Sequence, residues 1–447
     1  MSAPPPLSSR ALRRQAIPPP HVYKPPPGPF YDSELSPNGV INLSTAENDL
    51  LSGRLIEYLS RPLAIYPPHL KYRNTLLTSE LPTVEDLLPT YVNDHFHPLV
   101  QVTRENSVAG PGIGSLLAQL IWAIADEGAG VLLSSPFYDD YVRDIVHPSF
   151  ATPVLANVPA DVDSLSMEVF PYLEKSLHEH ASPISGEDKH EIQVLLLCNP
   201  HNPLGQVVAR EVVEGYALFA EKHNLHLVVD EVFGLSTFKS NYPPAVDAEF
   251  KSILSYDLAA LGVNPARAHV LVGPTKDFGA SGFKLGLLTS PSNPALISLI
   301  RPLFNATPIS AASDLFFARL LADKPLVDSF LKENSLKLGQ AYDFVAKWME
   351  GHGLPFVRAN AGVFVVVDLG PFIARMTGSA DMSDQERLDR AVAAMLEEKV
   401  FLKPTTLMAD PIPTRFRLIY AHPRPVMELA LRRIEKAFGV REAPLLE

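Results

Sequence analysis

Short, uninterrupted runs of apolar residues alternate with longer amphipathic segments from about residue 115 onward. Runs of this kind are typical of strands buried on both faces of a parallel sheet, and the segments between them have helical periodicity. The runs and their flanks span 128–136, 192–200, 225–233, 268–276 and 284–291, and the helical segments include 115–125 and 211–223. The pattern predicts an α/β fold with a mostly parallel sheet sandwiched by helices.

The C-terminal part of the chain has a different pattern. Beyond Pro308 it turns helical, and apolar runs then follow at 362–369, 400–404 and 415–421, with a helical segment near 383–398. We expect a smaller α+β domain here, to which the residues before the large domain also contribute. The predicted division is an arm at 1–35, an N-terminal part of the small domain at 36–65, a large domain at 66–310 and the rest of the small domain at 311–447. The polar stretch 171–191 is expected to be an exposed connection.

The first thirty residues contain ten prolines and no acidic residue. Proline cannot donate to a helix or a sheet ladder, so we predict an extended, disordered arm. Arg10, Arg13 and Arg14 lie near serines and weakly resemble an organellar transit peptide, but the prolines oppose the long amphipathic helix that such a peptide needs. A solvated arm is the simpler interpretation.

Composition narrows the classes of partner. Of the 447 residues, 46% are hydrophobic and 20% charged, which is enough to bury a large core, and the net charge of -12 disfavours nucleic acid as the main partner. No apolar stretch reaches the roughly 18 residues of a membrane span. The single cysteine, Cys198, excludes an internal disulfide and a Cys-based metal site. We therefore expect a cytoplasmic protein with a small-molecule site, and no metal, membrane or nucleic-acid partner.

Polar residues stand where four of the apolar runs end. They are Tyr138, Asn202, Asp230 and Lys276. In an open parallel sheet, ligands bind outside the carboxyl ends of the strands, so these side chains should converge on one site.

Several short motifs, taken in order, resemble the fingerprint of fold-type-I aminotransferases. They are NPHNPLG at 199–205, VVDEVF at 228–233, TKDFG and GFKLG within 275–286, and RFRL at 415–418. TAENDL at 45–50 is similar to the AEN segment of the 1-aminocyclopropane-1-carboxylate synthase subgroup. The resemblance runs from about Asn42 to the C-terminus. It implies the pyridoxal-5′-phosphate (PLP) transferase fold, PLP as cofactor, and a homodimer with the site at the subunit boundary.

The resemblance also implies the central chemistry. Lys276 would hold the cofactor as a Schiff base and then abstract the Cα proton of an amino acid, which suits an amine partly desolvated between a buried strand and a glycine-containing loop. Asp230 would pair with the pyridinium nitrogen so that the ring accepts electrons from Cα. A strand-end solvation role for Asp230 remains open.

Other matched positions surround the cofactor and the substrate. Asn202 would donate to the cofactor's 3′-oxygen, Tyr138 would stack on its ring, and Arg417 would clamp the substrate carboxylate with its forked guanidinium. Each has a structural alternative: Asn202 capping its own turn, Tyr138 packing in the core, and Arg417 in a salt bridge. Glu47 matches the acidic residue of the AEN segment and is a candidate substrate contact, or else a surface loop residue.

The phosphate end of the cofactor is expected at the turn 109–114, before the helix 115–125. Backbone N–H groups of Gly112 and Ile113 would meet the phosphate at the helix N-terminus. Thr275 and Lys284 are further candidate cofactor contacts.

Three positions depart from the family pattern, all beside the cofactor. Phe233 stands where the family has a tyrosine that donates to the 3′-oxygen, Gly273 where it has a serine phosphate ligand, and Lys284 where it has an arginine. Each change removes a donor, and charge-assisted donors contribute about 1.5–3 kcal/mol apiece. We expect looser cofactor binding and an altered choice of reaction.

The favoured function is an aminotransferase-type enzyme of specialised metabolism, acting on an α-amino acid through an external aldimine and a Cα carbanion. Ring closure on a sulfonium substrate and carbon–sulfur elimination remain open. A catalytically degenerate PLP-binding protein is the alternative of another class. A transcription regulator is set aside because the chain has no appended helix-turn-helix module.

Overall fold

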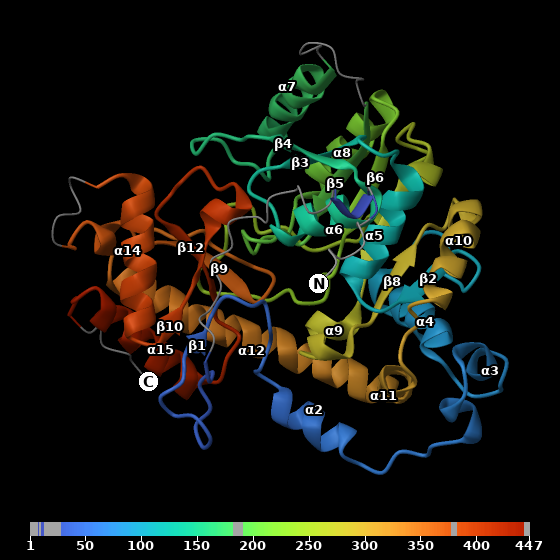
Figure 1. Cartoon of the computed structure of the whole chain (residues 1–447), viewed down its shortest axis with the longest axis horizontal. Coiled ribbons are helices and arrows are strands. Elements are labelled where there is room, and N and C mark those ends of the chain that lie inside the picture. The colour runs from blue at the N-terminus through green and yellow to red at the C-terminus, as the bar shows by residue number, and fades with distance from the viewer. Residues whose placement is uncertain (1–7, 9, 13–27, 182–190, 377–381, 442–447) are drawn as a thin grey trace, which may run out of the picture.

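The computed structural model of the chain describes residues 8, 10–12, 28–181, 191–376 and 382–441. Most of the proline-rich arm expected at 1–35, including Arg13 and Arg14, therefore lies outside the described residues. Two groups of elements stand side by side in Figure 1: one is built around a large sheet, and the other collects the C-terminal helices and a small sheet. No helix in the described ranges is long and apolar enough to cross a membrane.

The large sheet has seven strands in the order β2-β8-β7-β6-β5-β3-β4. Their bounds are β2 Ser107–Gly110, β3 Gly130–Ser134, β4 Thr152–Ala156, β5 Ile192–Cys198, β6 His226–Asp230, β7 Ala268–Val272 and β8 Gly286–Thr289. Strands β4, β3, β5, β6 and β7 run parallel, whereas β8 is antiparallel to both of its neighbours. The predicted α/β class with a mostly parallel sheet is confirmed, but the run at 284–291 gives an antiparallel strand.

Both faces of this sheet are buried, as the continuous apolar runs require. Successive strand residues alternate between two cores: Leu195 and Leu227 belong to one, and Val194 and Val228 to the other. Helices α5 (Ile113–Ile124), α6 (Asp140–Ser149) and α10 (Pro294–Ile300) cover one face. Helices α4 (Val84–Phe96), α7 (Phe170–Ala181), α8 (Arg210–Lys222) and α11 (Ala311–Ala322) contribute to the other core.

The expected connection at 171–191 is partly wrong, because residues up to Ala181 form α7. The many polar residues of this segment made the helical pattern difficult to recognise, but the helix is amphipathic and its buried Leu173 packs into the core. Residues 182–190 lie outside the described ranges.

The small sheet joins distant parts of the chain. It has the antiparallel order β11-β12-β9, with β9 Phe364–Asp368, β11 Lys403–Pro404 and β12 Arg415–Ile419. Beside it β1 (Ile41–Asn42) pairs in parallel with β10 (Val400–Phe401), so residues before the large sheet do lie against the C-terminal part. Helices α13 (Gly370–Ile373), α14 (Asp384–Glu397) and α15 (Arg424–Ala437) complete this group. The domain boundaries themselves stay a prediction.

One long helix links the two groups. Helix α12 (Lys324–Gly351) places Phe330 in the core under the large sheet and Leu338 and Met349 in the core of the smaller group. In Figure 1 it extends from beneath the large-sheet group to the smaller group at left. The remaining helices are α2 (Ser52–Leu59), α3 (Arg73–Leu77) and α9 (Pro274–Asp277).

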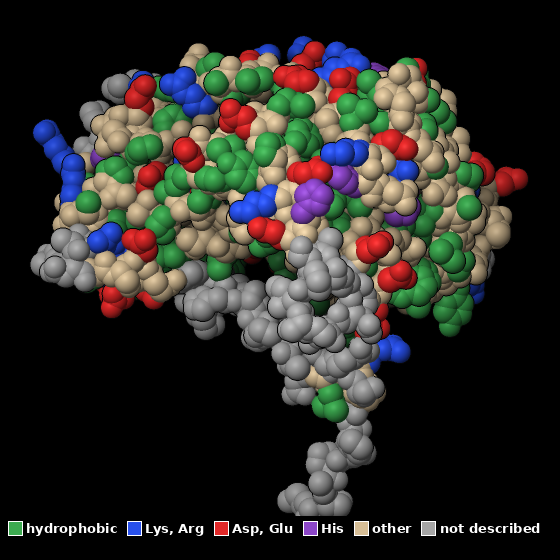
Figure 2. Space-filling view, turned by 90° about the horizontal axis from the view of Figure 1, so that it is seen from above, with side chains coloured by type: hydrophobic (Ala, Val, Ile, Leu, Met, Phe, Trp, Pro, Cys, Tyr) green, Lys and Arg blue, Asp and Glu red, His purple; other side chains and the backbone are tan. Residues whose placement is uncertain are grey.

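The surface carries mixed charge. On the face shown in Figure 2, basic side chains lie among acidic and apolar ones rather than in a continuous basic stripe. This face therefore does not resemble the basic footprint that nucleic acid requires.

Candidate active site

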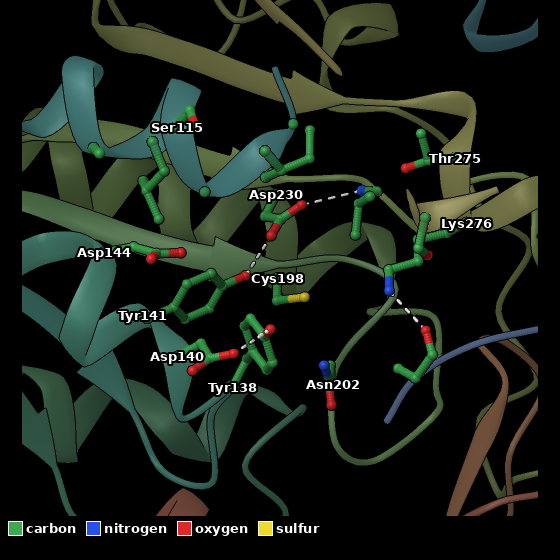
Figure 3. Close-up of a pocket in the computed structure, with 18 of the residues that line it drawn as sticks. Ser115, Tyr138, Asp140, Tyr141, Asp144, Cys198, Asn202, Asp230, Thr275 and Lys276 are labelled. Carbon is green, nitrogen blue, oxygen red and sulfur yellow. Dashed lines mark hydrogen bonds between the residues drawn. The ribbon is translucent and has the colours of Figure 1, made fainter. Parts of the chain in front are cut away.

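A pocket of about 590 Å³ opens at the carboxyl ends of the parallel strands. It lies where the chain leaves β3, β5, β6 and β7 and where α5 begins, which is the edge that the strand-end pattern predicts. Nine of the eleven candidate residues line it: Gly112, Ile113, Tyr138, Asn202, Asp230, Phe233, Thr275, Lys276 and Lys284. Figure 3 shows several of them facing one another across the cavity.

Lys276 lies in the short helix α9, directly after β7. Its Nζ donates to the backbone carbonyl of Ala46 at 2.6 Å. Burial, followed by the positive charge of Arg417, lowers the pKa of Lys276 to about 8. A useful fraction of the amine is therefore unprotonated near neutral pH, as a nucleophile or a base requires.

Asp230 is the last residue of β6 and is only 4% exposed. One carboxylate oxygen accepts from the Tyr141 hydroxyl at 2.6 Å, and the other from the Val232 N–H at 3.1 Å. Burial raises the pKa of Asp230 to about 6, although these two donors oppose the shift. An ionised carboxylate can accept about four hydrogen bonds, so buried Asp230 can accept others besides those from Tyr141 and Val232.

Arg417 does not line the pocket but contacts it through Asn202. From the central strand β12 of the small sheet, its guanidinium donates to Asn202 Oδ1 at 2.8 Å and to the Ser44 carbonyl at 2.6 Å. Its Nε is buried and has no hydrogen-bond partner among the described residues. The Asn202 carboxamide oxygen thus accepts from Arg417, and the guanidinium bonds an amide oxygen and a backbone carbonyl rather than a carboxylate.

Glu47 is the second candidate outside the pocket lining. It is exposed, yet its charge is near enough to favour the protonated form of Lys276. Its neighbours anchor the segment: Ala46 accepts from Lys276, and the Asn48 side chain donates to Asn334 of α12 at 2.8 Å. A loop residue with an exposed carboxylate is therefore held close to Lys276.

The start of α5 forms a corner of the pocket whose backbone N–H groups and neighbouring lysine suit an anion. Gly112 caps the helix with φ of 94°, which favours glycine, and its N–H donates to the Gly110 carbonyl at 2.8 Å. The expectation that Gly112 offers its N–H to a phosphate is thus modified, because the turn uses that donor. The N–H groups of Ile113, Gly114 and Ser115 have no partner within the helix, whose first bond runs from the Leu116 N–H to the Gly112 carbonyl at 3.2 Å. The Lys284 side chain lies against Gly112 and brings a positive charge to the same corner.

The departures at Phe233 and Gly273 have different surroundings. The Phe233 ring packs edge-on against Phe364 at 5.2 Å between centroids. A Cβ added at Gly273 would lie 3.0 Å from the Leu285 carbonyl oxygen and 3.4 Å from Ile113 Cδ1. The space beside Gly273 is therefore too tight for a serine without local movement.

Aromatic residues form one wall of the pocket. The Tyr138 hydroxyl donates to Asp140 at 2.8 Å, and its ring packs edge-on against Tyr141 at 5.2 Å between centroids. Tyr138 therefore faces the cavity while also packing against a buried neighbour. Tyr141, three residues later, is the main site residue that the motifs do not reveal, because it reaches the pocket from α6 and lies outside every motif of the sequence analysis.

Other pocket residues also lie outside the motifs. They are polar or small residues from α5, α6, β5 and the loop after α9: Ser115, Asp140, Asp144, Cys198 and Ser281. A single small or polar residue in a helix or a loop does not indicate a binding site, because such residues are commonly exposed to solvent at these positions.

Comparison with known proteins points to one family. The sequence profile of "Aminotransferase class I and II" matches residues 39–434. The chain is 31% identical over 364 residues to "Probable aminotransferase aclI" of Aspergillus oryzae, covering 80% of each chain. It is 29% identical over 414 residues to "1-aminocyclopropane-1-carboxylate synthase-like protein 1" of Bos taurus, covering 91% of this chain and 77% of that protein.

Solved structures share the fold. An engineered aspartate aminotransferase of Thermus thermophilus superimposes with a TM-score of 0.67 at 19% identity, over 97% of this chain and 99% of the other. At this identity the likeness establishes the fold, and the expected fold type I is confirmed.

Proposed function

Because this chain belongs to the class I and II aminotransferases and is a PLP-dependent enzyme, we propose that it transfers the amino group of an α-amino acid, with Lys276 as the catalytic residue. The observation that carries this proposal is the pairing of a largely buried lysine of lowered pKa with a buried carboxylate in one pocket of about 590 Å³. Lowered and raised pKa values in one cleft are typical of acid–base chemistry.

The pocket has a partner for each polar end of PLP. The phosphate would bind the first turn of α5 beside Lys284 and Thr275. The protonated ring nitrogen would donate a hydrogen bond to a carboxylate oxygen of Asp230, which can accept more bonds than the Tyr141 and Val232 donors use. The ring would lie against Tyr138, with Asn202 at its 3′-oxygen. These groups fit a phosphorylated pyridine with an aldehyde directed toward Lys276.

When bound, PLP supplies an electron sink for the Cα–H bond of an amino acid. Lys276 would take the Cα proton on Nζ and deliver it to the cofactor's aldehyde carbon, which an amine with a pKa of about 8 can do near neutral pH. The Ala46 carbonyl accepts from Nζ and so fixes the direction of the amine.

Arg417 would bind the substrate carboxylate. Two of its five N–H groups are already used to fix its plane, and the buried Nε still lacks a partner. A carboxylate from an α-amino acid would supply that partner. Glu47, exposed beside Lys276, would contact the substrate's cationic groups.

Two other reactions of the same family remain candidates, because they begin with the same proton transfer. Ring closure on a sulfonium amino acid is supported by the AEN segment and by the likeness to synthase-like relatives. Carbon–sulfur elimination requires a leaving group on the substrate. The changed contacts at Phe233, Gly273 and Lys284 support a specialised substrate, and hence specialised metabolism. A catalytically degenerate PLP-binding protein is disfavoured because Lys276, Asp230, Asn202 and Arg417 are all retained.

We also propose that the protein forms a homodimer. Large apolar side chains are exposed close together in sequence: Ile65, Tyr66, Leu70 and Tyr72, the last 92% exposed. Clustered exposed apolar residues favour a protein interface.

Product analysis distinguishes the reactions. The holoenzyme is incubated with α-amino acids, sulfonium amino acids and cysteine conjugates, each together with an α-keto acid as amino acceptor. The keto acid formed from the substrate, the cyclic product, ammonia and thiol are scored separately. Keto acid without ammonia or thiol supports amino transfer, whereas a cyclic product or a released thiol replaces it with one of the other two reactions. Lys276→Ala should abolish every product, and the exposed Lys175→Ala should abolish none.

A further inference from the structure

Tyr141 is a buried residue of the pocket to which the family motifs assign no role, and its hydroxyl bonds a residue that they do assign. It lies in the first turn of α6 and is 2% exposed. Its hydroxyl points from α6 to Asp230 at the end of β6. The oxygen–oxygen distance to Asp230 is 2.6 Å, which is the length typical of a charge-assisted bond from a hydroxyl to a carboxylate. Such a bond is among the stronger ones a neutral side chain can make to an anion.

The Tyr141 hydroxyl opposes the effect of burial on the pKa of Asp230. A donor to the ionised carboxylate favours that form, and the Tyr141 hydroxyl is the largest influence that lowers the pKa of Asp230. Burial and the nearby Asp230 charge raise the pKa of Tyr141 well above its ordinary value, so the phenol keeps its proton. Tyr141 therefore acts on Asp230 as a donor throughout the ordinary pH range.

The same ring also contacts the aromatic wall. Tyr141 meets Tyr138 edge-on at an interplanar angle of 86°. One side chain thus contacts both the carboxylate that would bind the cofactor's ring nitrogen and the aromatic ring that would stack on the cofactor, without itself being a matched family contact.

We propose that Tyr141 is a positioning residue that keeps Asp230 ionised and aimed at the cofactor's ring nitrogen, so that the proton of the pair stays on the ring. The inference rests on the proposed role of Asp230. Without the phenol, Asp230 holds a proton more strongly and competes with the ring nitrogen for it. The ring then withdraws fewer electrons from the substrate, although the pocket keeps its shape.

Tyr141→Phe isolates this effect, because it keeps the ring and its contact with Tyr138. Tyr216→Phe is the matched control: Tyr216 is 1% exposed, and its hydroxyl bonds Ser134 at 3.0 Å. Dissociation constants are measured for PLP and for its carbocyclic analogue, in which a C–H group replaces the ring nitrogen. The ratio of the two constants reports the carboxylate–nitrogen contact alone, since phosphate and aldehyde are common to both.

We expect Tyr141→Phe to lower the preference for PLP over the analogue by about tenfold, and to lower kcat of the holoenzyme with KM little changed. Tyr216→Phe should alter neither, although both variants lose a buried hydrogen bond and some thermal stability. An unchanged ratio in Tyr141→Phe would overturn the inference and leave Tyr141 a structural role only.

Asp230→Asn separates this failure from failure of the proposed function. If Asp230→Asn abolishes the preference for PLP and Tyr141→Phe does not reduce it, Asp230 has its proposed role and Tyr141 does not assist it. If Asp230→Asn also leaves the preference unchanged, the role of Asp230 is wrong, and the inference falls with it.

Discussion

At the scale of single residues, the positive charge beside the start of α5 comes from Lys284, whose ammonium is a point charge on a flexible side chain. Lys284 packs against Gly112 and has a left-handed backbone with φ of 52°. An ammonium attracts a phosphate but does not fork onto it as a guanidinium does. The proposed phosphate binding would therefore depend on charge and on the α5 N-terminus together.

Replacing this lysine should weaken PLP binding selectively. Lys284→Ala is expected to raise the dissociation constant for PLP about tenfold, because one charge-assisted contact to the phosphate is lost. The dissociation constant for pyridoxal, which lacks the phosphate, should stay the same. Fluorescence or absorbance titration of the apo-protein measures both; an equal loss for the two compounds would show that Lys284 does not contact the phosphate.

The strand-end residues were predictable from the sequence, whereas Tyr141 was not. Lys276 and Asp230 follow apolar runs that leave little doubt about where a parallel strand ends, and parallel strands end at one edge of the sheet. Tyr141 reaches Asp230 from a helix, and which side chains meet across an element depends on packing distances that a pattern of apolar residues does not contain. The engagement of the Gly112 N–H in its own turn was likewise not predictable.

At the scale of elements, the segment at 45–50 is held by a close contact between backbones. Gly279 has φ of 64°, and a Cβ placed on it would lie 2.2 Å from the Asn48 carbonyl oxygen. Only glycine allows the loop after α9 to approach the segment that carries Ala46 and Glu47.

Gly279→Ala should therefore damage both stability and the site. We expect a loss of about 2 kcal/mol or more in the free energy of unfolding, since strain and a clash act together, with a fall in activity as the Ala46 carbonyl moves from Lys276. Gly282→Ala is the matched control, because a Cβ there meets nothing within 4 Å. Chemical denaturation and steady-state kinetics compare the two; equal, small effects would contradict this account of the contact.

The end of β6 carries a second buried carboxylate, on Glu231. It accepts from the Ser252 hydroxyl and from the Ile253 N–H at 2.9 Å, and burial raises its pKa to about 8. The folded state thus keeps the Glu231 proton at pH values where the unfolded chain has already released it. Stability should fall as pH rises from about 5 to 8, because the folded state then binds more protons than the unfolded state.

Glu231→Gln should flatten that dependence. A single group in this state contributes a slope of about 1.4 kcal/mol per pH unit between its unfolded and folded pKa values. Unfolding free energies of wild type and variant, measured for the apo-protein across this range, should converge at low pH and separate in favour of the variant as pH rises. Parallel curves would mean that the pKa of Glu231 is not raised.

Elements were predictable where apolar periodicity was strong and less so elsewhere. The strands at β3, β5, β6 and β7 and helix α14 follow their predicted segments closely. The antiparallel direction of β8 could not be predicted, because a buried apolar run has the same sequence pattern in a parallel and in an antiparallel strand. The short strands β2 and β4 and the helix α7 were missed because their apolar residues are few or lie among polar ones.

At the scale of the whole molecule, the pocket depends on parts of the chain that are far apart in sequence. Lys276 from the large sheet bonds Ala46 near the N-terminus, and Arg417 from the small sheet bonds Asn202. The two groups of elements must therefore be correctly placed for the site to form. The motif order predicted which residues meet, but the contacts that lock them required the structure.

The proposed homodimer gives a prediction at the same scale. Leu70→Ser combined with Tyr72→Ser should shift the protein from a species of about twice the chain mass of 49.0 kDa to a monomer, because exposed apolar area is lost. Leu218→Ser, at an exposed apolar residue of α8, should leave the mass unchanged. Light scattering coupled to size-exclusion chromatography measures the mass; a monomeric wild type would contradict the proposal.

The most direct test of the central claim is to locate the cofactor on the chain. The protein is mixed with PLP, reduced with borohydride, digested, and analysed by mass spectrometry. A pyridoxyl adduct on Lys276, absent from Lys276→Ala, is the predicted result. An adduct on Lys284 instead, or none on Lys276, would contradict the assignment of Lys276 as the catalytic residue.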